Sequence, residues 1–223
     1  MSAFFVTGTD TEIGKTFTTC ALLHAARASG LTAVGYKPIA AGAEQTADGL
    51  ANEDALAIRA ASSAGFALGD INPICLREAV APHIAAAAEG VPFAVEPIVA
   101  GFERLAARAD LVLVEGVGGF CVPLTDTLDT ADLAAAFRLP VLLVVGMRLG
   151  CINHALLTVE AIHARGLPLA GWYANTLSPR MNRFDENLAA LEARIAAPLL
   201  GVLPHCAGGP AEAATAVRLP QRV

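Results

Sequence analysis

Cysteines are few in this sequence, and their spacing is unlike that of a disulfide framework or a zinc site. The five cysteines are scattered along 223 residues, and no two of them form a Cys-x-x-Cys pair. They are Cys20, Cys75, Cys121, Cys151 and Cys206. An odd number of scattered thiols is typical of reduced cysteines in the cytoplasm. A chain of this length can bury a full hydrophobic core without such crosslinks.

The sequence also lacks long apolar runs and a recognisable leader. Hydrophobic residues make up 55% of the chain, but no uninterrupted apolar stretch approaches the roughly 20 residues that cross a bilayer. Residues 1–6 run straight into a glycine turn, without the basic segment or cleavage site of a signal peptide. We therefore expect a cytoplasmic protein with no membrane partner.

Positive charge and aromatic side chains are scarce as well. The formal net charge is −6, the aromatic content is 5%, and no basic run stands out. A nucleic-acid-binding protein usually carries a basic surface for the phosphate backbone and aromatic rings for the bases. These two shortages argue against nucleic acid as a partner.

The sequence does contain short apolar runs that alternate with longer helix-like stretches. The runs are rich in Val and Leu and end at Gly, Pro or a polar residue, as strands buried on both faces do. Strands are predicted at residues 4–7, 33–36, 111–115, 141–145, 169–175 and 199–203. Helices are predicted at residues 16–29, 54–61, 99–109, 130–137, 153–164 and 183–195. This alternation predicts an α/β fold, a mostly parallel sheet with helices on both faces.

The stretch from residue 61 to residue 97 has a weaker pattern and more Gly, Pro and Ala. We interpret it as an excursion over the sheet that forms a lid or an interface. No repeat, low-complexity linker or domain boundary is visible in the sequence. Residues 1–223 are therefore predicted to form a single domain.

A glycine-rich loop with the sequence GTDTEIGKT joins the first predicted strand to the first predicted helix. Backbone N–H groups of such a loop and the helix N-terminus surround phosphate oxygens. Gly14 allows close approach, Lys15 supplies a cation and the Thr16 hydroxyl can bind Mg²⁺. The usual P-loop has four residues between its glycines, whereas five separate Gly8 from Gly14, so that Thr9 takes the first glycine position. The alternative is a strand-turn-helix whose Gly-Lys-Thr is coincidental.

Two carboxylates and a second lysine are placed to act at this phosphate site. Glu115 ends a predicted strand and Asp54 opens a predicted helix, and in P-loop enzymes such a carboxylate lies near magnesium. Lys37 follows the second strand, and the proline after it favours an extended backbone. A cation there would stabilise charge on a transferring phosphoryl group. The alternatives are a solvent-exposed strand-end glutamate, an ordinary first-turn acid and a surface lysine.

Several segments together resemble the dethiobiotin synthetase family of P-loop enzymes, which close a cyclic urea ring in biotin biosynthesis. The segments are residues 8–16, 36–38, 52–55, 115–119, 149–154 and 170–172. They occur in the family's order and spacing between residues 3 and 204, and the five-residue spacer is the family's own form of the loop. The string Gly-Cys-Ile-Asn-His has little reason to arise from packing.

The resemblance implies a reaction and its cofactors, ATP and Mg²⁺. The substrates would be diaminopelargonic acid (7,8-diaminononanoate) and CO₂, which combine to a carbamate. ATP would phosphorylate the carbamate to a carbamic–phosphoric anhydride. The second amine would then close the ring to dethiobiotin, releasing phosphate.

The resemblance also implies roles for individual residues. Lys37, Lys15 and Thr11 would be catalytic, and Thr16, Asp54 and Glu115 would hold the metal. The nucleotide would be bound by Glu12, Ile13, Gly14, Lys15, Thr16, Phe17, Asp54, Glu115, Gly116, Val117, Gly118, Asn175, Thr176, Pro204, His205 and Cys206. The substrate would be bound by Thr11, Lys37, Ala41, Gly118, Leu149, Gly150 and Asn153.

Similar enzymes are homodimers in which the loop at residues 150–153 reaches the substrate carboxylate of the neighbour. A helix N-cap is the alternative for Asn153. Similar proteins often have Ser or Thr where this chain has Ala40 and Ala41, so a hydroxyl contact to the substrate is in question.

Two other classes of P-loop protein compete with this interpretation. Amidotransferase synthetases carry a glutaminase domain with a nucleophilic cysteine, and 223 residues leave no room for one. Partitioning-type ATPase switches usually have a second lysine early in the loop, and residues 9–13 contain none.

Overall fold

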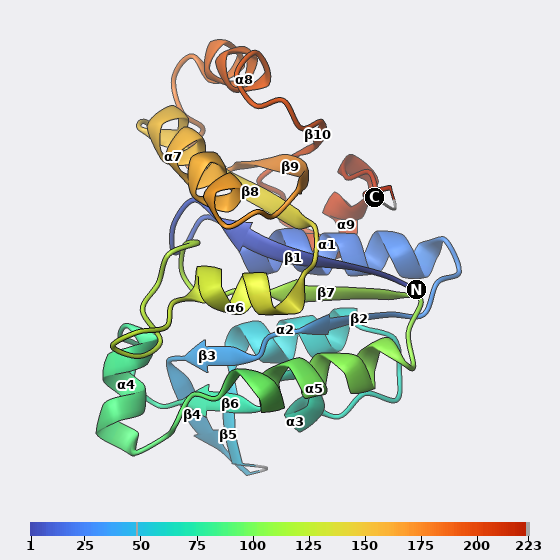
Figure 1. Cartoon of the computed structure of the whole chain (residues 1–223). Helices are drawn as coiled ribbons and strands as arrows, with labels where there is room; N and C mark the ends of the chain where they lie inside the picture. Colours follow the sequence, from blue (N-terminus) through green and yellow to red (C-terminus); the bar gives the residue numbers. More distant parts are fainter. Residues whose placement is uncertain (48, 222–223) are drawn as a thin grey trace.

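The computed structural model describes residues 1–47 and 49–221; Asp48, Arg222 and Val223 of the predicted domain lie outside the described residues. A six-stranded sheet forms its centre, with the strand order β10-β9-β8-β1-β7-β2 (Figure 1). Its strands are β1 (Ser2–Gly8), β2 (Ala33–Tyr36), β7 (Leu111–Glu115), β8 (Val141–Met147), β9 (Leu169–Thr176) and β10 (Leu199–Leu203). All neighbouring strands in this sheet run parallel, which confirms the predicted parallel sheet.

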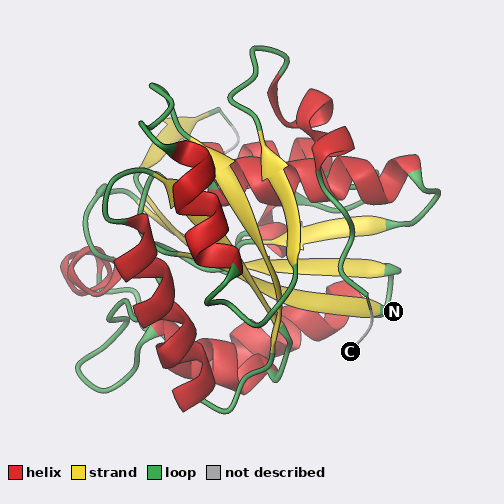
Figure 2. Ribbon diagram, turned by 90° about the horizontal axis from the view of Figure 1, so that it is seen from above, coloured by secondary structure: helices red, strands yellow, loops and turns green. Residues whose placement is uncertain are grey.

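Helices cover both faces of the sheet (Figures 1 and 2). On one face α1 (Lys15–Ala28) contacts α2 (Glu53–Ala61), α9 (Gly209–Ala213) and the 3-10 turn η1 (Ala214–Ala216). On the other lie α5 (Val95–Ala106), α6 (Thr130–Phe137) and α7 (Cys151–Ala164), and α8 (Phe184–Glu192) packs beside α7. This arrangement confirms the predicted α/β class.

An aromatic cluster joins β1 and β2 to α5 and α6. The Phe137 ring lies 6.2 Å from that of Phe5, 6.4 Å from that of Tyr36 and 5.6 Å from that of Phe102, measured between ring centroids. The Tyr36 hydroxyl donates a hydrogen bond of 2.9 Å to the carbonyl of Ile98, so its polar end is satisfied in the core. These four aromatic residues thus fill part of one face of the sheet.

The region between β2 and α5 contains short elements that the sequence did not predict. They are β3 (Ile39–Ala41), β4 (Ala43–Thr46), β5 (Gly49–Asn52), α3 (Leu68–Ile71), β6 (Ile74–Leu76) and α4 (Pro82–Glu89). The strands have only three or four residues, too few to display a period. The helix predicted at residues 99–109 instead spans Val95–Ala106, because Pro97 is tolerated in its first turn.

None of the helices within the described residues is long and apolar enough to cross a membrane. All five cysteines have free thiols, as their spacing predicts.

The close approach of α2 to β2 positions Lys37 and Asp54 relative to each other. Gly35 of β2 has no side chain, and a Cβ there would lie 2.3 Å from Cγ2 of Ile58 in α2. Lys37 follows β2 and Asp54 lies in the first turn of α2, so this contact sets the distance between them.

Substitution of Gly35 tests this packing. We expect Gly35→Ala to lower the free energy of unfolding by about 1–3 kcal/mol because it overfills the contact. Urea denaturation followed by the fluorescence of Trp172, the single tryptophan, measures the loss. The double variant Gly35→Ala/Ile58→Leu lacks the opposing methyl group and should regain part of the stability. A loss in the double variant equal to the sum of the losses in the two single variants would contradict the close approach.

Candidate phosphate- and metal-binding site

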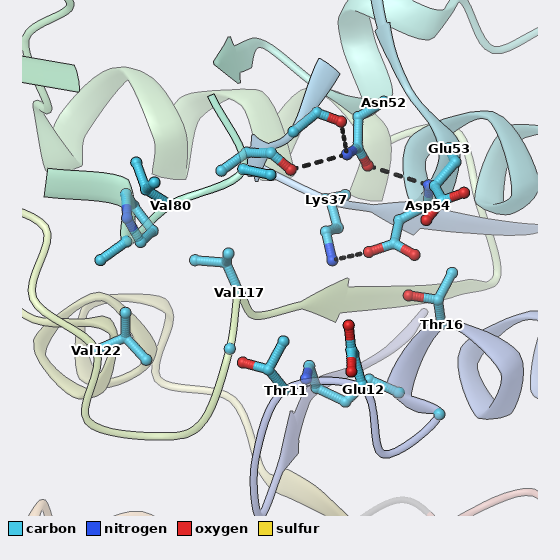
Figure 3. A pocket seen from close by; sticks show the side chains of 18 of the residues that line it. Thr11, Glu12, Thr16, Lys37, Asn52, Glu53, Asp54, Val80, Val117 and Val122 are labelled. Atoms are coloured by element: carbon cyan, nitrogen blue, oxygen red, sulfur yellow. Dashed lines mark hydrogen bonds and ion pairs between the residues drawn. The ribbon is translucent and has the colours of Figure 1, made fainter. Parts of the chain in front are cut away.

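A cavity of about 780 Å³ lies beyond the carboxyl ends of β1, β2 and β7, where parallel α/β sheets bind their ligands (Figure 3). Half of the predicted site residues line it. They are Thr11, Glu12, Gly14, Lys15, Thr16, Phe17, Lys37, Ala41, Asp54, Val117 and Gly118.

The phosphate loop is held in a conformation that requires glycine at residue 14. Gly14 has a φ of +85°, and a Cβ there would lie 2.1 Å from the Asn175 amide nitrogen. The Asn175 side chain, which comes from β9, donates a hydrogen bond of 2.9 Å to the carbonyl of Ile13. Gly118, with a φ of +66°, brings the turn after β7 against Thr11. Asn175 and Gly118 therefore contact the phosphate loop at two different places.

Lys15 and Lys37 are the only lysines in the sequence, and both line the cavity. The Lys15 ammonium donates to the carbonyl of Asp10 at 2.9 Å. Burial lowers the pKa of Lys15 to about 8, although the negative charge of Glu115 opposes this shift. Burial also opposes the charged form of Lys37, but Glu115 and Asp54 outweigh it and raise the pKa of Lys37. The two carboxylates thus favour the charged form of Lys37.

The Lys37 ammonium bridges two carboxylates. Its Nζ lies 2.7 Å from Oε1 of Glu115 and 2.9 Å from Oδ2 of Asp54. Glu115 has no solvent exposure, and Lys37 has 3%. Burial favours neutral Asp54, but the Lys37 charge and the Thr16 hydroxyl together lower the pKa of Asp54. The alternatives of an exposed strand-end glutamate and a surface lysine are therefore wrong.

The three predicted metal ligands come together around this ammonium. The Thr16 hydroxyl donates to Oε1 of Glu115 at 2.7 Å, and Asp54 lies across the Lys37 ammonium from it. Hydroxyl and carboxylate oxygens are the ligands that Mg²⁺ prefers, and the position already accommodates a cation. Within residues 1–47 and 49–221 no three His, Cys, Asp or Glu side chains gather as a metal site. A divalent ion here would therefore take further ligands from water and phosphate.

Two polar residues of the site were missed by the sequence analysis. Thr19 donates from α1 to Oε2 of Glu115 at 2.5 Å. Its three-residue spacing from Thr16 places both hydroxyls on one face of the helix, and this spacing is visible in the sequence. Asn52 caps α2, accepting from the backbone N–H of Asp54 at 3.0 Å. It also donates to the carbonyls of Ala41 and Gly42, at 3.0 and 3.1 Å.

The end of the cavity away from Asp54 and Thr16 is apolar. Figure 3 shows Val80, Val117 and Val122 there, and Ala79, Ala81 and Pro82 continue the lining. Part of this wall comes from the segment leading into α4, within the stretch that the sequence suggested as a lid or an interface. Such a wall can pack against methylene groups.

The remaining predicted residues lie outside the lining of this cavity as the structure describes it. Leu149 is 93% exposed and Gly150 is the N-cap of α7, whereas Asn153 lies within the first turn. The N-cap interpretation of Asn153 is therefore wrong. Thr176 ends β9, Gly116 packs over Phe5, and Pro204, His205 and Cys206 follow β10.

An ion pair connects this second group of residues to the phosphate loop. The guanidinium of Arg148 pairs with the carboxylate of Asp10. Arg148 lies between β8 and α7, immediately before Leu149, so the loop that precedes α7 is adjacent to the phosphate loop.

Solved structures similar to this chain are P-loop nucleotide-binding proteins. The MinD cell division protein of Aquifex aeolicus superposes with a TM-score of 0.57 at 14% identity, covering 92% of this chain and 83% of that one. The cell division protein FtsY of Thermotoga maritima gives a TM-score of 0.51 at 15% identity, covering 90% and 60%. At these identities the likeness shows the fold alone, and it confirms a P-loop NTPase-like fold.

Sequence relatives are much closer. A family model described as an AAA domain matches residues 2–208. The ATP-dependent dethiobiotin synthetase BioD of Aromatoleum aromaticum is 64% identical over 98% of this chain and 97% of its own length. The protein of the same name from Xylella fastidiosa is 53% identical over the same shares. With such identity along nearly its whole length, the chain belongs to the family of ATP-dependent dethiobiotin synthetases.

Proposed function

We propose that this ligase forms dethiobiotin from 7,8-diaminononanoate and CO₂ in a reaction that needs ATP and Mg²⁺. The observation that carries the proposal is the Lys37 ammonium held between Glu115 and Asp54, at 2.7 and 2.9 Å. It lies beside a phosphate loop, in a cavity whose other end is apolar. The phosphate loop would bind the nucleotide, the ammonium group would stabilise the transferring charge, and the apolar wall would contact the aliphatic part of the diamine.

Binding and charge neutralisation account for most of the catalysis that we propose. Thr16, Asp54 and Glu115 would hold Mg²⁺, which neutralises charge on the phosphates. Backbone N–H groups between Glu12 and Phe17 would bind the triphosphate at the N-terminus of α1, where the helix dipole favours negative charge. The γ-phosphate would lie beside Lys15.

The chemical steps that we propose use Lys37, Lys15 and Thr11. One substrate amine adds to CO₂ and loses a proton, giving a carbamate. A carbamate oxygen attacks the γ-phosphorus and ADP leaves, so that a carbamic–phosphoric anhydride forms. The second amine attacks the anhydride carbonyl carbon, loses a proton and expels phosphate. The two ammonium groups stabilise the negative charge that moves between these oxygens.

The aliphatic part of the substrate would lie along Val80, Val117 and Val122. Ala41 lines the same cavity and contributes no hydroxyl, so the substrate would contact a methyl group at this position.

Adenine would bind near Asn175 and Thr176, with Pro204, His205 and Cys206 beside them. The Asn175 amide nitrogen is used to hold the carbonyl of Ile13, which leaves its oxygen as an acceptor for the adenine amino group.

We also propose a homodimer in which Gly150 and Asn153 bind the substrate carboxylate in the neighbour's site. Leu149 and Leu157 are large apolar side chains with 93% and 56% exposure, as expected of interface residues in an isolated chain. The backbone N–H groups at the start of α7 are suitable donors to a carboxylate. A partitioning-type ATPase, in contrast, is supported by fold likeness alone.

The first test is phosphate release from MgATP. We expect release to require both the diamine and bicarbonate, with dethiobiotin identified by mass spectrometry. Lys37→Met should lower kcat by about 10²-fold or more because a stabilising charge is lost. Arg59→Met, an exposed change in α2, is the matched control and should keep wild-type rates. ATP hydrolysis that ignores the diamine would rule out the synthetase reaction and favour a switch-type ATPase.

The stability of Lys37→Met without ligands provides a second test. Removing the ammonium leaves buried Glu115 without its cation, so we expect the free energy of unfolding to fall by about 3 kcal/mol. Mg²⁺ should then raise the melting temperature of the variant more than that of the wild type, in which Lys37 competes for the same oxygens. Thermal denaturation with and without Mg²⁺ measures both. Equal increases would contradict a metal site at Glu115 and Asp54.

Mixed dimers test whether the neighbour completes each site. Lys37→Met and Asn153→Asp chains, each inactive alone, are co-expressed with different tags and purified together. In a mixed dimer one site carries both defects and the other carries neither. The mixed dimer purified through both tags should therefore have about half of the wild-type activity, because one of its two sites is intact. No recovery in a verified mixed dimer would show that each chain uses its own loop.

A further inference from the structure

One hydroxyl group in the site has no role in the proposed reaction, that of Thr19. Thr16 and Thr19 are three residues apart on α1 and therefore lie on one face of the helix. They contact different oxygens of the same carboxylate: Thr16 donates to Oε1 of Glu115 at 2.7 Å, and Thr19 donates to Oε2 at 2.5 Å. Thr19 and Glu115 are both completely buried.

The two oxygens of Glu115 have different surroundings. Oε1 accepts from Thr16 and, at 2.7 Å, from the Lys37 ammonium, and both of these residues line the cavity. Oε2 accepts from Thr19, which is completely buried. The terminal torsion of a glutamate is broad, so nothing intrinsic to the side chain fixes the plane of its carboxylate. A short hydrogen bond from a rigid helix to one oxygen therefore determines where the other oxygen points.

We propose that Thr19 is a positioning residue for the proposed metal ligand Glu115. By holding Oε2, it keeps Oε1 directed at the place where Thr16 and Asp54 meet. Partners that orient a ligating carboxylate contribute strongly to metal affinity, although they do not touch the metal. The inference rests on the proposed function only in assuming that a divalent cation binds there.

Thr18 provides a matched control on the same helix. Its hydroxyl is buried and donates to the carbonyl of Gly14 at 2.9 Å, and the same carbonyl accepts from the Thr18 backbone N–H at 3.0 Å. Thr18→Val thus removes an equivalent buried hydroxyl, leaves its acceptor partnered and does not involve Glu115.

The experiment measures Mn²⁺ binding to the full chain through the electron paramagnetic resonance signal of the free ion, without turnover. We expect Thr19→Val to weaken Mn²⁺ affinity about tenfold. Thr19→Ser keeps the hydroxyl and should bind within about twofold of the wild type, as should Thr18→Val. The apparent KM for Mg²⁺ in turnover should rise for Thr19→Val in parallel with the Mn²⁺ dissociation constant.

Asp54→Asn distinguishes failure of this inference from failure of the metal site. If Asp54→Asn weakens Mn²⁺ binding but Thr19→Val does not, the role of Thr19 is overturned and the metal site stands. If neither variant weakens it, the metal site itself is wrong and the inference falls with it. Should Thr19→Val fail to fold, Thr19→Cys retains the size with a weaker donor, and unchanged Mn²⁺ affinity in that variant would also overturn the proposal.

Discussion

The site depends on one buried negative charge, the Glu115 carboxylate at the carboxyl end of β7. Because it has no solvent exposure, its burial is costly unless a positive charge and hydrogen-bond donors lie close by. Lys37, after β2, provides the charge, and Thr16 and Thr19 of α1 provide the donors. Three elements far apart in the sequence must meet at this carboxylate. The contacts that pack these elements together therefore also arrange the polar groups of the site.

The two carboxylates of the site are not equivalent. The Asp54 side chain is 39% exposed, whereas that of Glu115 is fully enclosed. Asp54 therefore lines the cavity, whereas the Glu115 carboxylate is enclosed by Lys37, Thr16 and Thr19. The Lys37 ammonium offsets one of the two negative charges, and in the function proposed above its flexible stem would let it turn toward the phosphates when Mg²⁺ binds.

Local sequence was sufficient for the parts of the structure with long or distinctive patterns. The strand at residues 111–115 and the helix at residues 130–137 have the predicted bounds, and the phosphate loop was recognisable from its motif. Short strands such as Ile39–Ala41 were missed because three residues show no period. Thr19 and Asn52 were missed because their roles arise from contacts with distant elements. The helix predicted to begin at Asn153 begins at Cys151 instead, because Gly150 before it is the N-cap.

The restriction of lysine to two positions has a consequence for observing this protein. Of its 15 lysine and arginine residues, 13 are arginine, so the cavity holds every side-chain primary amine of the chain. Arginine remains charged at any pH that a folded protein survives, and it does not react as an amine. Protein produced with isotopically labelled lysine would therefore give only two side-chain ammonium resonances. Both would report the charge state of the cavity, with no overlapping signal from surface lysines.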